Sequence, residues 1–228
     1  MSDRRIALIG ATGMVGRAFM ARCVGQRGIR LGAIARRRID LPQGARVEFF
    51  VADAANWGET IAALRPHVVV NALGTTWRKA GQDEAAFRAV DERLVLEVAR
   101  AARDAGVRQF ISLSSVGADL ASRHVYLRVK GEVEQALMKL RFGRLDILRP
   151  GLLRGDRIDD HRPAERALML ASPVTDLLLQ GQFRRLRSIS AERLADSILG
   201  LTAARANGRF VHEHDALLRA ARRVAEPA

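Results

Sequence analysis

A tyrosine and a lysine lie four residues apart and have the chemistry to move a proton. Tyr126 is the only tyrosine of the chain, and Lys130 is one of its three lysines. A spacing of four puts both side chains on one face of a helix. An ammonium beside a phenol favours the phenolate, which brings proton transfer within reach of neutral pH. The pair therefore predicts general acid–base catalysis by Tyr126, tuned by Lys130, with ordinary packing of the two side chains as the alternative.

Two serines precede this pair and end an apolar run. The hydroxyl of Ser114 or Ser115 could hydrogen-bond a carbonyl oxygen while Tyr126 exchanges the proton. We favour Ser115 as the catalytic serine, and the choice between the two stays open at this point.

Three glycines near the N-terminus predict a phosphate-binding turn. Gly10, Gly13 and Gly16 follow an apolar run and precede a helical pattern. In such a turn the first glycine allows the tight bend, the second lets the backbone approach a phosphate, and the third allows the helix to pack closely on the sheet. Free amides at the helix start would then bind a pyrophosphate. A glycine-rich turn without a ligand is the alternative.

The end of the second apolar run indicates which dinucleotide binds. Folds that prefer NAD place an acid there, but this chain has Arg36 and Arg37, and the nearest acid is Asp40. Guanidinium groups match a phosphate, so NADP(H) is expected and NAD(H) is less favoured. The alternative is that these are surface arginines of an arginine-rich chain. Asp53, after the third run, is placed to accept a hydrogen bond from the adenine amino group.

Short apolar runs alternate with helical patterns along the chain. Continuous rather than alternating apolar strands indicate a parallel sheet covered on both faces, so the fold class is α/β, a doubly wound, Rossmann-like parallel sheet. The runs expected as strands are 5–9, 31–35, 47–51, 68–70, 110–113 and 145–148, and the clearest helical stretches are 15–24, 84–105, 125–140, 163–180 and 191–203.

The length of 228 residues predicts one domain, 1–228, whose C-terminal part is a small cap. The pattern loosens after residue 150, and we expect residues 151–190 to form a substrate cap within that domain. The apolar stretch 167–179 fits a cap and a surface for a protein partner equally well. Pro173 and Asp176 argue against a membrane span there. Residues 209–212 fit a last edge strand.

Charge and composition narrow the partners. The net charge is +13, but only three of the 38 basic residues are lysines, the arginines are dispersed, and aromatic residues make up 5%. Dispersed arginines with few stacking platforms argue against nucleic acid as a partner. We expect a monomer or homodimer acting on a small molecule.

The single cysteine, Cys23, indicates a reducing compartment, and with no apolar leader evident we expect a cytoplasmic protein. His212 and His214 flank Glu213 without a third ligand at a suitable spacing, so no metal site is expected. We interpret this segment as an exposed strand end.

Taken together, these motifs resemble the atypical branch of the short-chain dehydrogenase/reductase superfamily, and within it the Tat-interacting-protein-like (CC3-like) oxidoreductases. The resemblance covers about residues 5–205. It is carried by residues 10–16, Arg36-Arg37, Leu73-Gly74-Thr75-Thr76, Lys79-Ala80-Gly81, Val90-Asp91, Ser114-Ser115-Val116-Gly117, Tyr126-Leu127-Arg128-Val129-Lys130-Gly131-Glu132 and Arg149-Pro150-Gly151.

The resemblance implies an NADPH-dependent reductase acting on a small carbonyl or alcohol, with Tyr126 as the proton donor or acceptor. A redox-silent NADP(H)-binding sensor, or an assembly or regulatory protein, is the alternative that the same branch supports. The cofactor-binding residues that it implies, besides the glycines, are Thr12, Met14, Val15, Arg36, Arg37, Ala72, Leu73, Tyr126, Lys130, Leu153 and Arg162.

The chain departs from the family pattern in three ways. Ser115 precedes Tyr126 by fewer residues than in typical reductases. The asparagine of the usual proton relay is not evident, and Asp91 stands near its place. The segment after Pro150 is short for a sugar-nucleotide domain, which argues against a nucleotide-sugar epimerase.

Overall fold

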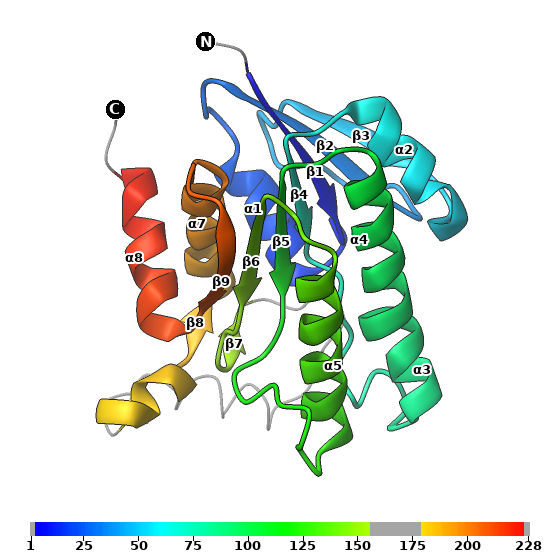
Figure 1. The fold of residues 1–228 in the computed structure, drawn as a ribbon. Helices are drawn as coiled ribbons and strands as arrows, with labels where there is room; N and C mark the ends of the chain where they lie inside the picture. Colours follow the sequence, from blue (N-terminus) through cyan, green and yellow to red (C-terminus); the bar gives the residue numbers. More distant parts are fainter. Residues whose placement is uncertain (1–2, 156–178, 226–228) are drawn as a thin grey trace.

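The computed structural model describes residues 3–155 and 179–225 and contains a seven-stranded parallel sheet (Figure 1). Its strand order is β3-β2-β1-β4-β5-β6-β9, with every neighbouring pair parallel. The order reverses between β1 and β4, the point where ligands bind in doubly wound sheets. The strands are β1 (Arg4–Ile9), β2 (Ile29–Ala35), β3 (Val47–Val51), β4 (Val68–Asn71), β5 (Gln109–Leu113), β6 (Arg144–Leu148) and β9 (Gly208–His212). The predicted fold class is confirmed, and the expected last edge strand is present as β9.

Helices cover both faces of the sheet, which explains the unbroken apolar strands. One face carries α1 (Met14–Arg22), α7 (Ala191–Thr202) and α8 (His214–Ala225), and the other carries α2 (Trp57–Leu64), α3 (Glu84–Arg88), α4 (Val95–Asp104) and α5 (Val125–Lys139). Two separate apolar clusters fill these layers. Leu8, Phe19 and Ile198 are buried in the first, and Ile9 and Phe110 are buried in the second. Alternate residues of β1 therefore stabilise opposite layers.

One helix expected over residues 84–105 is interrupted. Between α3 and α4 the segment η2 (Ala89–Leu94) is a π-helix. Such a bulge turns a side chain that would otherwise follow the helical period, and it often occurs at functional sites. Here Asp91, which lies in this segment, is fully buried.

A small second sheet lies beyond the carboxyl end of the main one. It pairs β7 (Leu153–Arg154) with β8 (Ile189–Ser190), and η3 (Gly181–Leu186) precedes β8. A short helical turn, η1 (Ala54–Asn56), precedes α2. Most of the expected cap, and the helix expected over 163–180, lie outside the described residues, so the cap stays a prediction. Within the described ranges, no helix is long and apolar enough to cross a membrane.

The segment that contains His212 is not the exposed strand end that we expected. The Nε2 of His212 lies 2.8 Å from Oδ1 of Asp146, which is fully buried on β6. Arg144 and Gln109 also donate to this carboxylate, at 2.7 and 2.8 Å. Burial acts to raise the pKa of Asp146, but these hydrogen bonds outweigh it and hold the pKa below its usual value. The edge strand is thus anchored to a buried charge, and the neighbouring His214 is buried as well.

Candidate active site

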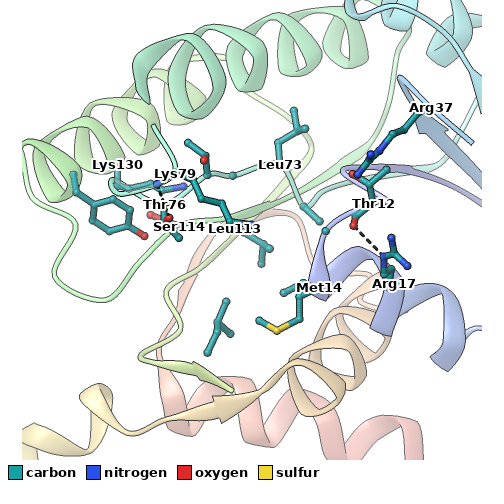
Figure 2. A pocket seen from close by; sticks show the side chains of 17 residues that line it. Thr12, Met14, Arg17, Arg37, Leu73, Thr76, Lys79, Leu113, Ser114 and Lys130 are labelled. Atoms are coloured by element: carbon teal, nitrogen blue, oxygen red, sulfur yellow. Dashed lines mark hydrogen bonds between the residues drawn. The ribbon is translucent and has the colours of Figure 1, made fainter. Parts of the chain in front are cut away.

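A cavity of about 270 Å³ opens at the carboxyl ends of the central strands (Figure 2). The turn after β1, the loop after β4, the end of β5, the first part of α5 and β7 all contribute to it. Its lining residues are Thr12, Gly13, Met14, Val15, Arg17, Arg37, Ala72, Leu73, Gly74, Thr75, Thr76, Lys79, Leu113, Ser114, Tyr126, Lys130 and Leu153. The fold therefore brings most of the residues singled out in the sequence into one place.

The glycine turn is held by close backbone approaches. Gly10 has a φ of +87°, and a Cβ there would lie 2.5 Å from the carbonyl carbon of Ala72. A Cβ at Gly16 would lie 2.3 Å from the carbonyl oxygen of Gly10. These two glycines thus let the turn, the loop after β4 and the helix start pack together. By contrast, a Cβ at Gly13 would meet only that same Gly10 oxygen, at 3.4 Å, so Gly13 is not needed for packing.

The start of α1 is open toward the cavity. Gly13 occupies the N-cap position and offers no side-chain hydrogen bond to the first-turn amides, so these amides and the helix dipole remain available to an anion. Met14 and Val15 of that turn line the cavity. Arg17, one turn further on, donates from Nε to the carbonyl of Thr12 at 3.0 Å and adds a positive charge beside the turn.

The predicted helix face is formed, and it holds Lys130 in an ion pair. Both Tyr126 and Lys130 lie on α5 and line the cavity. The Nζ of Lys130 lies 2.7 Å from Oδ1 of Asp91, while Oδ2 of Asp91 accepts from the backbone amide of Thr75 at 2.7 Å. Burial acts to lower the pKa of Lys130, but the nearby Asp91 carboxylate and other negative groups outweigh it and raise that pKa. Lys130 therefore stays protonated at neutral pH.

Aromatic packing positions the ring of Tyr126. Its ring lies 5.3 Å from that of Phe87, centroid to centroid, and Phe87 in turn meets Trp77 edge-on at 5.9 Å. Phe87 is fully buried, whereas Tyr126 is only half-buried. Such pairs fix ring orientation, so the tyrosine is positioned on the wall of the cavity.

The two serines are placed differently. Ser114 lines the cavity, and its hydroxyl donates to Glu134, a buried carboxylate on α5. Arg149 also donates to that carboxylate, with its Nε 2.9 Å from Oε1, the oxygen that accepts from Ser114. The hydroxyl of Ser115 contacts the carbonyl of Val116 at 3.2 Å, and Ser115 is not among the lining residues. Of the two serines, Ser114, which we did not favour from the sequence, is therefore the one that lines the cavity.

The residues expected at the adenosine end are only partly assembled. Arg37 lines the cavity, while Arg36 and Asp53 are exposed and lie outside its lining. Arg162 lies outside the described residues. Ala72, Leu73 and Leu153 line the cavity.

The sequence interpretation missed several cavity residues. Thr75, Thr76 and Lys79 come from the loop after β4, and Arg17 comes from α1. The loop lies at the carboxyl end of a central strand, where ligands bind in such sheets, and that position was the available signal. Asp91 was noted in the family resemblance and near the place of the relay asparagine, but not as the partner of Lys130.

Comparison with known proteins decides the family. The NAD(P)H-binding family matches residues 10–169. The chain belongs to this family. It is also 39% identical over 167 residues to protein fmp52, mitochondrial, of Emericella nidulans (70% of this chain and 71% of that one). It is 38% identical over 169 residues to protein HTATIP2 of Rattus norvegicus (72% of this chain and 69% of that one). These similarities support the Tat-interacting-protein-like assignment within the atypical short-chain dehydrogenases/reductases.

Solved structures confirm the fold. The chain is similar to the Bordetella bronchiseptica enzyme WbmH in complex with NAD+, with a TM-score of 0.69 and 15% identity over 92% of this chain and 75% of that one. That likeness shows the fold. The match to the NAD(P)H-binding family supports a nicotinamide cofactor and an oxidoreductase-type role.

The expected cytoplasmic location is wrong on this comparison. The fungal relatives are named as mitochondrial proteins. A low cysteine content indicates a reducing compartment but does not distinguish one such compartment from another, so it could not predict where in the cell the protein lies.

Proposed function

We propose that the protein is an NADP(H)-dependent oxidoreductase that transfers hydride to or from a small carbonyl or alcohol. The observation that carries this proposal is that Tyr126 and Lys130 share one cavity with the open start of α1. A proton-transferring pair and an anion-binding helix start in the same cavity fit a nicotinamide cofactor beside a reacting oxygen.

The residues present fit such a cofactor. The amides of Met14 and Val15, uncapped by Gly13, would hold the pyrophosphate, and Ala72 and Leu73 would lie along the cofactor. When bound, the nicotinamide supplies or accepts the hydride. The chain itself supplies orientation, charge and a proton.

Tyr126 gives its phenolic proton to the carbonyl oxygen in reduction and takes it back from the alcohol in oxidation. Lys130 stabilises the phenolate that reduction leaves behind, because its ammonium is kept charged by Asp91. A serine at the end of β5 orients the reacting oxygen. Ser115 was expected in this role, and the position of Ser114 in the cavity lining supports Ser114 instead.

Arg37 supports a preference for NADP(H). It is the basic residue after β2 that reaches the cavity, and no acid follows that strand until Asp40. A guanidinium in this place would pair with a 2′-phosphate. Arg36, exposed beside it, is proposed as a second, weaker contact.

A redox-silent NADP(H)-binding sensor is the second candidate, and one observation favours it. The hydroxyl proton of Ser114 is already donated to Glu134. Because a serine has one hydroxyl hydrogen, Ser114 then offers a carbonyl oxygen no donor.

Replacement of the tyrosine separates the two candidates. The protein is purified, its bound nucleotide is identified, and NADPH consumption is followed with a panel of aldehydes and ketones. Tyr126→Phe keeps the ring packing and removes the proton, so turnover should fall about 10²–10⁴-fold with little change in cofactor affinity. Lys130→Met should weaken both turnover and binding. If the native protein binds NADPH but none of the carbonyl compounds on the panel causes NADPH to be consumed, the result would favour the sensor.

The location that we propose in the cell rests on the names of the relatives. Those named mitochondrial support a mitochondrial location for this chain. A small-molecule substrate and a monomeric or homodimeric state complete the proposal.

A further inference from the structure

A second hollow, of about 400 Å³, lies beside the small sheet of β7 and β8, and its described lining shares no residue with the candidate active site. It is bounded by β8, the first turn of α7 and the first turns of α8, all near the lower end of the main sheet in Figure 1. Leu153 and Arg154 are consecutive residues of β7, and Leu153 lines the active-site cavity while Arg154 lines this hollow. Successive strand residues point to opposite faces, so β7 separates the two.

The charge of this hollow is one-sided. Arg154, Arg187 and Arg193 all line it, and no carboxylate belongs to its described lining. Arg149, by contrast, lies against a carboxylate, that of Glu134. Three guanidinium groups around one hollow repel each other unless an anion lies between them.

Arg154 has an unmet hydrogen-bond requirement. Its Nε is buried and has no hydrogen-bond partner among the described residues. Leaving such a donor unpaired is costly, and more so for a charged group. Arg187 uses its own Nε on the carbonyl of Leu179, at 2.8 Å, but a guanidinium carries further N–H donors.

The start of α7 adds to the same side of the hollow. Ser190 caps this 12-residue helix by accepting from the amide of Arg193 at 3.2 Å, and Ser190 itself lines the hollow. A helix start favours negative charge. A tetrahedral dianion has more acceptor oxygens than a carboxylate, so it meets more of the donors gathered here.

We propose that this hollow is a binding site for a phosphate group, either free phosphate or a phosphate monoester. Arg154, Arg187 and Arg193 supply the charge, and the start of α7 supplies the helix dipole. The site is independent of the cofactor site and of the proposed reaction, because Arg154 and the cavity-lining Leu153 lie on opposite faces of β7.

The test is an NMR titration of the full chain with inorganic phosphate at constant ionic strength. Backbone amide signals report two places in one experiment, the start of α7 and the start of α1, so binding at the cofactor site is recognised separately. Saturable shifts at residues 190–193 are expected. A parallel titration with glycerol phosphate identifies the source, because tighter binding of the ester points to a phosphorylated small molecule and equal binding to phosphate itself.

Arg154→Gln should weaken the phosphate affinity at the start of α7 about tenfold or more, as the loss of one charge-assisted hydrogen bond implies. Arg193→Gln, at an exposed position that the fold tolerates, should act in the same direction. The matched control is Arg100→Gln, the same charge change at an exposed site on α4. Absent or non-saturating shifts, or equal effects of all three variants, would overturn the proposal.

Discussion

The ammonium of Lys130 lies 2.7 Å from a carboxylate oxygen of Asp91, and both side chains are almost fully buried. They come from α5 and from the π-helical turn η2, and the second oxygen of Asp91 is held by the amide of Thr75. A buried lysine beside a cofactor cavity would tend to lose its proton. This carboxylate prevents that, and so keeps the positive charge next to Tyr126.

Asp91→Asn should destabilise the fold and lower the pKa of Lys130. Removing one partner of a buried ion pair costs about 3–5 kcal/mol, measured here as the free energy of unfolding in urea at pH 7. The pair raises the pKa of Lys130, so its stabilisation is complete below the ordinary lysine pKa and is lost as pH rises through the higher folded value. The difference in unfolding free energy between the native protein and Asp91→Asn should therefore become smaller in strongly alkaline solution.

Asp104→Asn serves as the control for Asp91→Asn, because Asp104 is exposed on the neighbouring α4 and loses the same charge. Its free energy of unfolding should change by no more than about 0.5 kcal/mol. If the loss of unfolding free energy in Asp91→Asn stays constant from pH 7 into the alkaline range, Lys130 is not the group whose ion pair stabilises the fold.

Arg37→Ala should selectively weaken NADPH binding. A lost guanidinium–phosphate contact costs about 1.5–3 kcal/mol, so calorimetry should show at least about a tenfold loss for NADPH and little change for NADH. Arg36→Ala should act in the same direction but less, and Arg38→Ala, exposed and outside the cavity lining, is the control. Equal affinity of the native protein for both cofactors would contradict the proposed preference.

Ser114→Ala and Ser115→Ala distinguish the two serines. Ser114 lines the cavity and donates to Glu134, so its loss should lower turnover of an identified carbonyl substrate and leave a buried carboxylate with one fewer donor, at a cost of about 1–3 kcal/mol in unfolding free energy. Ser115 lies outside the lining, so Ser115→Ala should change turnover little. The opposite ranking in steady-state kinetics would restore Ser115 as the orienting serine.

Substitutions in the glycine turn separate binding from folding. A Cβ at Gly13 has room beside Gly10, so Gly13→Ala should change the unfolding free energy by less than about 1 kcal/mol while weakening cofactor binding about tenfold or more. A Cβ at Gly16 would strike backbone, so Gly16→Ala should cost about 1–3 kcal/mol of stability. Thermal melts and cofactor titrations of the two variants check this pair. Normal cofactor affinity in a folded Gly13→Ala protein would argue against a pyrophosphate at this turn.

Local pattern was enough to predict much of the architecture. The continuous apolar run 68–70 is buried on both faces, and consecutive residues are enough to predict that burial. The four-residue spacing of Tyr126 and Lys130 likewise needs only the helical period, and both line the cavity as that period requires. The fold class, the family and the shared face of this pair were therefore determined by the sequence alone.

Contacts between distant segments were decided only by the tertiary structure. The sequence pattern over 84–105 predicts a regular helix and gives no sign of the π-helical turn. That turn buries Asp91 against Lys130, which lies 39 residues further along the chain. Adjacent serines look equivalent in a sequence, yet Ser114 meets Glu134 from another element and Ser115 does not. Likewise, Arg154 gathers with Arg187 and Arg193 only because β7 pairs with β8. Such contacts depend on how the elements pack together, which the local periodicity that identifies each element does not specify.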